Sequence, residues 1–458
     1  GTARRRVRTA RGLDGASLAY HLSRRAAELA QEACSLYRRE ASYDGRDLFV
    51  LGAMGPSNHV VSATTANLRR ASFDTVADNF YRQALGLIDG GADVLLFETQ
   101  QDILEMKAGV FGVRRALSER GKSLPIIGQV TVDQFGRMQL FNTDIHAALV
   151  TVQGIGLDVF GINCSIGPDL MEKTAERLGR LSALPVSVIP NAGLPVSEKG
   201  KTVFKFAPDK FAEHLKSFVC DYGIRVVGGC CGTTPEHIAC TVETLKSAVP
   251  KRFSPPRLVY VSGPQEAVAL DSAENLIRFG ERLNIRGSKK VRDAVENDDG
   301  INHDVLDAVV REQVHELGCQ IIDVCMDSNQ VDTVATLREV VRGQTNDFPG
   351  AMSLDSFQVD ALAEAVKVYP GRPILNSISL EETAPGVLKM DAVIEATSGH
   401  DPVFVALCTG PSGPAATAED KCRLAGDILD RARERYGIEA ERIFVDVNVF
   451  PIGSESLP

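Results

Sequence analysis

The sequence has no tryptophan, only 6% aromatic residues and no long apolar run. Its main apolar runs, such as VLLFE at 94–98 and FVALC at 404–408, have the length of strands. They fall far below the roughly 18 residues of a membrane-spanning helix. The chain also has no excess of positively charged residues, since its net charge is −10. Neither a membrane nor a nucleic acid is therefore expected as a partner.

Cysteine is sparse as well. Ten cysteines in 458 residues are too few for a secreted disulfide scaffold, and no signal-peptide stretch opens the sequence. The composition, 44% hydrophobic and 24% charged, is that of a soluble globular protein. The sequence predicts a reduced, cytoplasmic protein.

Apolar runs of strand length alternate with helical patterns along the whole chain, which indicates βα units and a parallel sheet. One of the helical patterns covers 73–91. Each half of the chain has six runs. They are 48–54, 93–99, 125–132, 159–165, 185–191 and 224–231 in the first half, and 277–284, 320–326, 351–356, 373–379, 402–408 and 442–448 in the second.

Polar and reactive residues follow most of these runs, as in a (β/α)8 barrel, whose active site lies at the carboxyl ends of the strands. The alternative is a doubly wound open sheet, which normally carries a GxGxxG loop after its first strand. The sequence has no such loop. We therefore predict an α/β protein with two (β/α)8 TIM-type barrels in tandem, each short of two strands. The expected domains are 1–250 and 276–458, joined by a linker at 251–275 that holds three prolines.

Three cysteines follow two of the predicted strands: Cys164 in GINCSIGP, and Cys230 with Cys231 in GGCCGTTPEH. Three thiolates that meet in a barrel mouth match a zinc site. Neighbouring residues of a regular strand point to opposite faces, so the strand must break its pleat at the cysteine pair. The flanking glycines supply the necessary backbone freedom.

Three protein ligands leave one tetrahedral position open, which is the pattern of a catalytic zinc. Zinc with an open position can bind a substrate thiol as its thiolate, a nucleophile near neutral pH. The same three cysteines are therefore the predicted catalytic residues. His237 follows them in TPEHI, and we expect it to start a helix rather than to bind the metal.

Carboxylates and carboxamides follow the strands of the second half, with no histidine base among them. They are Asn284, Asp323, Asp355, Asn376 and Asp446, with Asp327 as a weaker candidate. A carboxylate can accept a bidentate pair from an amino-pyrimidinone, and an asparagine can donate and accept at another edge. The set predicts a site for a flat heterocycle with several N–H donors.

The motifs NCSIGP (163–168), PNAGLP (190–195), GGCCGTTPEHI (228–238) and FETQQD (97–102) resemble the homocysteine-binding barrel of the cobalamin-dependent methionine synthase family. The wider homocysteine S-methyltransferase family shares the three cysteines. The resemblance implies that Cys164, Cys230 and Cys231 hold zinc, with the sulfur of L-homocysteine as the fourth ligand. It also places Glu98 at a strand end facing the substrate, where a carboxylate can pair with an ammonium group.

The motifs FGERLNIRGSKK (279–290), SLDSF (353–357) and NSISL (376–380) resemble the pterin-binding barrel of the same family. The resemblance implies that Asp355, Asn376 and Asp446 hold the pterin ring of methyltetrahydrofolate. The implied reaction passes the methyl group to cobalamin and then to homocysteine, giving methionine and tetrahydrofolate. The chain departs from the family at Cys325, where asparagine is usual, and along 403–415.

The resemblance starts after the family's first two barrel strands and stops after the sixth strand of the second barrel. We therefore expect a fragment of a longer protein, and a cobalamin module supplied in cis or in trans, because the sequence has no Asp-x-His-x-x-Gly loop. One alternative keeps the zinc-dependent thiol S-methyltransferase but changes the methyl donor or acceptor of the corrinoid-linked half. Another is a non-catalytic binding module stapled by zinc.

Overall fold

A computed structural model describes residues 15–64, 68–255, 258–270, 276–297 and 299–449. The chain divides into two compact units, Gly1–Pro256 (unit 1) and Arg257–Pro458 (unit 2). Within the described ranges, no helix is long and apolar enough to cross a membrane.

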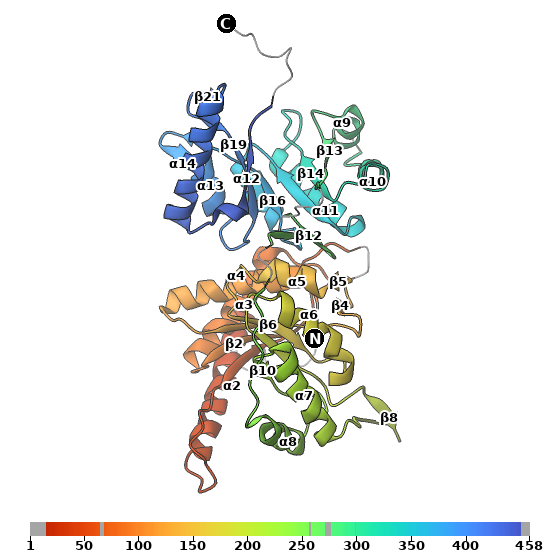
Figure 1. Cartoon of the computed structure of the whole chain (residues 1–458), viewed down its shortest axis with the longest axis vertical. Helices are drawn as coiled ribbons and strands as arrows, with labels where there is room; N and C mark the ends of the chain where they lie inside the picture. Colours follow the sequence, from red (N-terminus) through yellow and green to blue (C-terminus); the bar gives the residue numbers. More distant parts are fainter. Residues whose placement is uncertain (1–14, 65–67, 256–257, 271–275, 298, 450–458) are drawn as a thin grey trace. The chain divides into compact units, whose positions relative to one another are not determined.

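Unit 1 is built on one six-stranded parallel sheet whose strands lie side by side in chain order (Figure 1). The strands are β1 (Leu51–Met54), β2 (Val94–Gln100), β3 (Ile126–Val130), β6 (Val159–Asn163), β7 (Val186–Ile189) and β10 (Val226–Val227). The helices are α2 (Gly15–Tyr37), α3 (Phe73–Asp89), α4 (Ile103–Arg120), α5 (Ile145–Val152), α6 (Pro168–Leu181), α7 (Pro208–Tyr222) and α8 (Pro235–Leu245). Two hairpins, β4–β5 (Arg137–Met138, Thr143–Asp144) and β8–β9 (Val196–Glu198, Lys201–Val203), extend loops after the strands. All six predicted strands of the first half are confirmed, and so is the helix predicted at 73–91.

Unit 2 repeats this plan. Its sheet is formed by β13 (Phe279–Asn284), β14 (Ile321–Cys325), β15 (Ala351–Asp355), β16 (Ile374–Ile378), β19 (Val403–Leu407) and β22 (Ile443–Asp446), again parallel and in chain order. The helices are α9 (Lys289–Val295), α10 (His303–Arg311), α11 (Thr333–Asp347), α12 (Val359–Val366), α13 (Lys389–Ala396) and α14 (Ala418–Tyr436), with a π-helical turn at Glu312–Glu316 and a 3-10 turn at Ala440–Arg442. Two short hairpins, β17–β18 (Glu382–Ala384, Val387–Leu388) and β20–β21 (Thr409–Gly410, Gly413–Pro414), follow β16 and β19. The six predicted strands of the second half are also confirmed.

The strand order distinguishes between the two predicted architectures. A doubly wound sheet reverses direction at a switch point, so its spatial order differs from its chain order. Both sheets here keep chain order from the first strand to the last, as a (β/α)8 barrel does. Each sheet has six strands in the described part of the chain, and its first and last strands are not paired with each other.

The middle of the segment predicted as a linker, 251–275, needs a correction. Strands β11 (Tyr260–Ser262) and β12 (Ala267–Ala269) form an antiparallel hairpin that belongs to unit 2. Val261 is fully buried and packs in one cluster with four residues at the amino ends of neighbouring strands: Ile321, Ala351, Ile374 and Val403. The Tyr369 hydroxyl donates to the carbonyl of Ser262 (2.9 Å), which ties the hairpin down. The hairpin therefore closes the amino end of the sheet.

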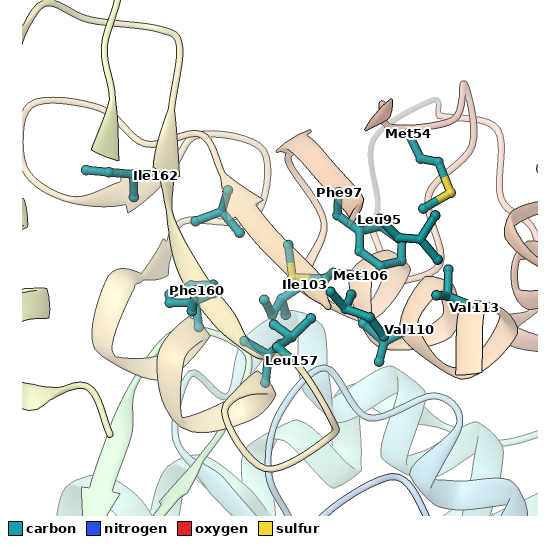
Figure 2. Close-up of a cluster of buried hydrophobic side chains, with 14 of the residues drawn as sticks. Met54, Leu95, Phe97, Ile103, Met106, Val110, Val113, Leu157, Phe160 and Ile162 are labelled. Atoms are coloured by element: carbon teal, nitrogen blue, oxygen red, sulfur yellow. The ribbon is translucent and has the colours of Figure 1, made fainter. Parts of the chain in front are cut away.

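The core of unit 1 lies between the sheet and its helices. Leu95 and Phe97 of β2 are buried with Met106 and Val110 of α4 (Figure 2). Helix α4 begins where Asp102 accepts a hydrogen bond from the Leu104 amide, and it ends at Gly121 in the left-handed conformation. These caps fix the length of the helix that follows the candidate residue Glu98.

Helices α3 and α4 approach closely at Gly112, where a Cβ atom would lie 2.0 Å from the carbonyl oxygen of Ala77. We expect Gly112→Ala to lower the free energy of unfolding by about 1–3 kcal/mol, because backbone must shift to admit the methyl group. Thermal unfolding followed by circular dichroism measures the change. Gly426→Ala in α14 is the matched control, since nothing lies within 4 Å of its added Cβ. It should stabilise by up to about 1 kcal/mol. Equal effects of the two changes would contradict the close approach.

Candidate functional site

The structure brings the three predicted cysteines together. Cys164 follows β6, and Cys230 and Cys231 follow β10, so all three lie at carboxyl ends of strands. The sulfurs of Cys164 and Cys231 are 3.8 Å apart, and all three sulfurs lie within 4.8 Å of one another. Tetrahedral zinc with Zn–S bonds of about 2.3 Å requires S···S distances of about 3.8 Å. The donor set therefore fits a zinc ion with one position left for another ligand.

The backbone around the cysteines is fixed by strand β7 and the residues after it. The Cys164 amide donates to the carbonyl of Ile189 (3.0 Å), and the Cys230 amide donates to the carbonyl of Pro190 (2.8 Å). The Cys231 amide donates to Oδ1 of Asn191 (3.0 Å). One short segment thus holds all three cysteines. Asn191 lies in the PNAGLP motif, but its positioning role was not predicted from the sequence.

Left-handed backbone at the strand ends turns the cysteines toward one another. Cys164 has φ 61° and Ser165 has φ 68°, so the chain leaves the pleat directly after β6. Gly232 has φ +80°, and a Cβ there would lie 2.2 Å from the ring of Phe204. The predicted break in the pleat at the cysteine pair is therefore present, and the glycine is required by both conformation and space.

The cysteine cluster disfavours its own ionisation in the absence of a cation. Burial raises the pKa of Cys230, and the neighbouring thiols of Cys164 and Cys231 raise it further. The pKa of Cys231 is raised by burial and by Cys164. A divalent cation reverses this effect, because it stabilises the thiolates that otherwise repel one another.

His237 and Glu98, which belong to the motifs around the cysteines and the β2 strand end, lie in the following surroundings. His237 forms a capping box with Thr234 at the start of α8, and its Nε2 lies 2.8 Å from the carbonyl oxygen of Phe206. The prediction that His237 starts a helix is confirmed. Glu98 is half-buried near the end of β2, beside a register shift between Phe97 and Gln100. Asn163 holds that bulge through two hydrogen bonds to Thr99, at 2.8 Å and 2.9 Å.

In unit 2, three candidate residues and Cys325 form one row across neighbouring strands. Asn284 pairs with Cys325, Cys325 with Asp355, and Asp355 with Asn376. Asp323 precedes Cys325 by two residues, and its Oδ1 accepts a hydrogen bond from Nδ2 of Asn376 (3.4 Å). Cys325, where the chain departs from the resembled family, is thus in the middle of the row and buried.

Burial raises the pKa of both Asp323 and Asp355, and the charge of Asp355 raises that of Asp323 further. Lys389 opposes the effect at Asp355, since its positive charge lowers the pKa of that carboxyl. Lys389 is 4% exposed, and its own pKa is lowered by burial. Nothing in the sequence marked this lysine, which lies at the start of α13 after a hairpin. Asp323 and Asp355 can therefore hold a proton beside a carboxylate oxygen that accepts hydrogen bonds from N–H groups.

The side chains of three other candidates accept hydrogen bonds from loop residues. Oδ1 of Asn284 accepts hydrogen bonds from the amides of Arg286 and Gly287, both at 2.9 Å. Asp327 accepts from the Ser356 hydroxyl and the Phe357 amide, both at 2.7 Å. Asp446 is exposed and accepts from the amide of Asn448 (2.7 Å). Of the predicted set, Asp323 and Asn376 are joined by a hydrogen bond, and Asp355 pairs with Asn376 across neighbouring strands.

Comparison with known proteins matches each half of the chain to a family model. The model of the homocysteine S-methyltransferase family matches residues 2–245, more than half of the chain. The chain belongs to the homocysteine S-methyltransferase family. A second model, that of pterin-binding enzymes, matches residues 280–456.

Two relatives match nearly the whole chain. Methionine synthase of Mycobacterium tuberculosis is 32% identical over 442 residues, and methionine synthase of Mycobacterium leprae is 31% identical over 447 residues. Each match covers 95% of this chain and 36% of the relative, so the chain spans about a third of the length of either. Among solved structures, the apo form of homocysteine methyltransferase MmuM from Escherichia coli matches 51% of this chain and 76% of its own, with 24% identity and a TM-score of 0.40.

A buried carboxylate anchors the loop that follows β1. Glu105, in the first turn of α4, accepts a hydrogen bond from the Ser57 amide (2.7 Å). Its neighbour Asp102 accepts from the amides of Val61 and Ser62, at 2.8 Å and 2.9 Å. Burial raises the pKa of Glu105 to about 7. Between about pH 4.5 and pH 7 the folded state therefore keeps a proton that the unfolded state has released.

This raised pKa predicts a pH-dependent stability. The contribution of Glu105 is lost as the pH rises from about 4.5 to about 7, because an ionised buried carboxylate destabilises the folded state. Glu105→Gln should remove this dependence, and its advantage over the wild type should grow by about 3 kcal/mol between pH 4.5 and pH 8. Denaturant unfolding at several pH values measures it, with the exposed Asp47→Asn as control. An advantage that stays constant with pH would contradict the assignment.

Proposed function

We propose that the chain carries the homocysteine and folate sites of a cobalamin-dependent methionine synthase. In this proposal unit 1 binds zinc and L-homocysteine, and unit 2 binds methyltetrahydrofolate. The single observation that carries it is the cluster of three sulfurs with a 3.8 Å Cys164–Cys231 distance, in a chain of this family. The net reaction moves a methyl group from N5 of methyltetrahydrofolate to the sulfur of homocysteine through a corrinoid.

The three cysteines would hold the zinc, and Asn191 would keep Cys231 directed toward it. Bound zinc supplies a Lewis acid that lowers the pKa of a coordinated thiol. The half-buried Glu98 lies at the same edge of the sheet and would pair with the ammonium group of the amino acid. A carboxylate accepts charge-assisted hydrogen bonds from an ammonium group, and Glu98 places one at this strand end.

In unit 2, Asp355 and Asn376 would accept and donate hydrogen bonds at the edge of the pterin ring, and Asp323 would hold a proton beside them. Asn284 and Asp446 would lie at the rim of the same pterin site. A tertiary amine is a poor leaving group, so N5 needs a proton or a strong hydrogen bond as the methyl group departs. The raised pKa of Asp323 keeps a proton available close to neutral pH. The corrinoid would come from a separate module, in cis or in trans, and the assembly would work in the cytoplasm.

Cys325 favours a second candidate function. It takes the place in the polar row where the resembled family has asparagine, so a carboxamide is replaced by a buried thiol. In this alternative unit 2 serves a corrinoid protein with a different methyl donor. Methyl transfer from methyltetrahydrofolate to free reduced cobalamin separates the two. Transfer supports the folate site, and binding of the corrinoid without transfer supports another donor.

Replacing a metal-binding cysteine tests the site in unit 1. Cys230→Ser should lose most of the bound zinc and the transfer of methyl from free methylcobalamin to L-homocysteine, because two thiolates hold the metal far less tightly than three. Elemental analysis and product formation give the two readouts. Cys220→Ser, at a half-buried position in α7, is the control and should keep both. Full activity without zinc would overturn the proposal.

Replacing the central carboxylate of the row tests the site in unit 2. Asp355→Asn should weaken methyltetrahydrofolate binding by about 10- to 100-fold, because a charge-assisted hydrogen bond contributes about 1.5–3 kcal/mol. Isothermal titration calorimetry measures the affinity. Asp360→Asn, an exposed residue of α12, is the control. Unchanged binding by Asp355→Asn would remove this residue from the site.

A further inference from the structure

Helix α2 carries an exposed apolar stripe. Leu22, Leu29 and Leu36 recur every seven residues and are 60%, 50% and 63% exposed. Ala26 and Ala33 fall between them and are exposed as well. Spacings of four and three residues put all five on one face of the helix, in the a and d pattern of a coiled-coil seam. A seam of this kind is normally buried against another helix.

The opposite face of α2 is occupied by α3, and the two helices lie side by side (Figure 1). A Cβ atom at Gly86 of α3 would lie 2.3 Å from the carbonyl oxygen of Tyr20, and one at Gly90 would lie 2.8 Å from the Cβ atom of Ala27. The Tyr20 hydroxyl also donates to Asp89, at 2.8 Å. At about 100° per residue, this face lies roughly 150° around the helix from the leucines. Unit 1 therefore holds α2 by one face, and the leucine face stays exposed.

One border of the stripe is charged, and the other carries small residues. Arg25 and Glu32 lie on the charged border, seven residues apart, and their side chains form an exposed ion pair with an N···O distance of 2.7 Å. Ser23 and Ala30 lie on the other border. Two opposite charges at equivalent heptad positions are complementary to themselves. When a second copy of the helix lies antiparallel, Arg25 faces the partner's Glu32, and the two-fold axis repeats the pair.

The same antiparallel register matches the sizes of the apolar side chains. With Arg25 opposite the partner's Glu32, Leu29 packs on the partner's Ala26, and every further layer likewise pairs a leucine with an alanine. A large side chain opposite a small one lets two helices approach closely and fills the seam without voids. A parallel pair would instead put leucine against leucine and would not bring the two charges together. Both the charges and the packing therefore favour the antiparallel arrangement.

We propose that the stripe on α2 is a docking surface for a second copy of this chain, and that two α2 helices pack antiparallel about a two-fold axis to form a homodimer. The contact runs from Ala19 to Leu36, over about 26 Å of helix. This is short for a permanent interface, so we expect a dimer that dissociates in the micromolar range. The inference concerns the surface of α2 alone and does not depend on the function proposed for either unit.

Sedimentation velocity on the full chain tests the dimer. The wild type should pass from monomer to dimer between about 1 and 100 μM. Leu29→Glu should weaken dimerisation by at least about tenfold, because it places a charge inside the apolar seam. Leu317→Glu, at an exposed leucine of unit 2 (45%), is the matched control and should leave dimerisation unchanged. Leu29 is exposed in the monomer, so the diluted variant should keep the unfolding temperature of the wild type.

Charge reversal tests the antiparallel register. Arg25→Glu should weaken dimerisation by about threefold or more, because like charges then face each other, and added salt should reduce the effect. Combining Arg25→Glu with Glu32→Arg should restore wild-type dimerisation, since the reversed pair is again complementary. A double variant as weak as the single one would overturn the register. A wild type that stays monomeric up to about 100 μM, or a dimer that Leu29→Glu leaves intact, would overturn the docking surface itself.

Discussion

The parallel register of neighbouring strands is the constraint on which both sites depend. Cys164 and Cys231 are 67 positions apart in the chain, yet their sulfurs are 3.8 Å apart because β6, β7 and β10 end side by side. In unit 2 the same arrangement places Asn284, Cys325, Asp355 and Asn376 in one row. Sequential strand order collects residues from every βα unit at one edge, and loops after the strands can then vary without disturbing the core.

Both sites gather groups that resist ionisation on their own. Burial and close neighbours raise the pKa of Cys230 in unit 1 and of Asp323 and Asp355 in unit 2. Such clusters raise the free energy of the folded protein unless a ligand relieves the repulsion. The relief differs with the chemistry of the donors. Three sulfurs bind a soft divalent cation. Carboxylates and an asparagine instead form hydrogen bonds with the N–H donors of a flat ring.

The apolar runs predicted every strand of both sheets, because buried parallel strands need continuous hydrophobic side chains. The cysteine cluster was also predictable, since Cys164 and the Cys230–Cys231 pair directly follow such runs. The hairpin at 260–269 was not, because its strands have three residues each and follow several prolines. Lys389 and Asn191 were missed for another reason. Each acts through contacts with residues of other segments of the fold, Lys389 with Asp355 and Asn191 with Cys231, which no local pattern records. Asp446 is exposed, and its Oδ1 accepts a hydrogen bond from the amide of Asn448, two residues further along the chain.

The proposed function depends on three cysteines that hold a zinc ion with a position open for a substrate thiol. Zinc-edge X-ray absorption on the purified protein, with and without L-homocysteine, tests it most directly. We expect three sulfur ligands and one lighter atom at first, and four sulfur ligands once homocysteine is added. A zinc-loaded protein whose spectrum does not change on addition of homocysteine would contradict it.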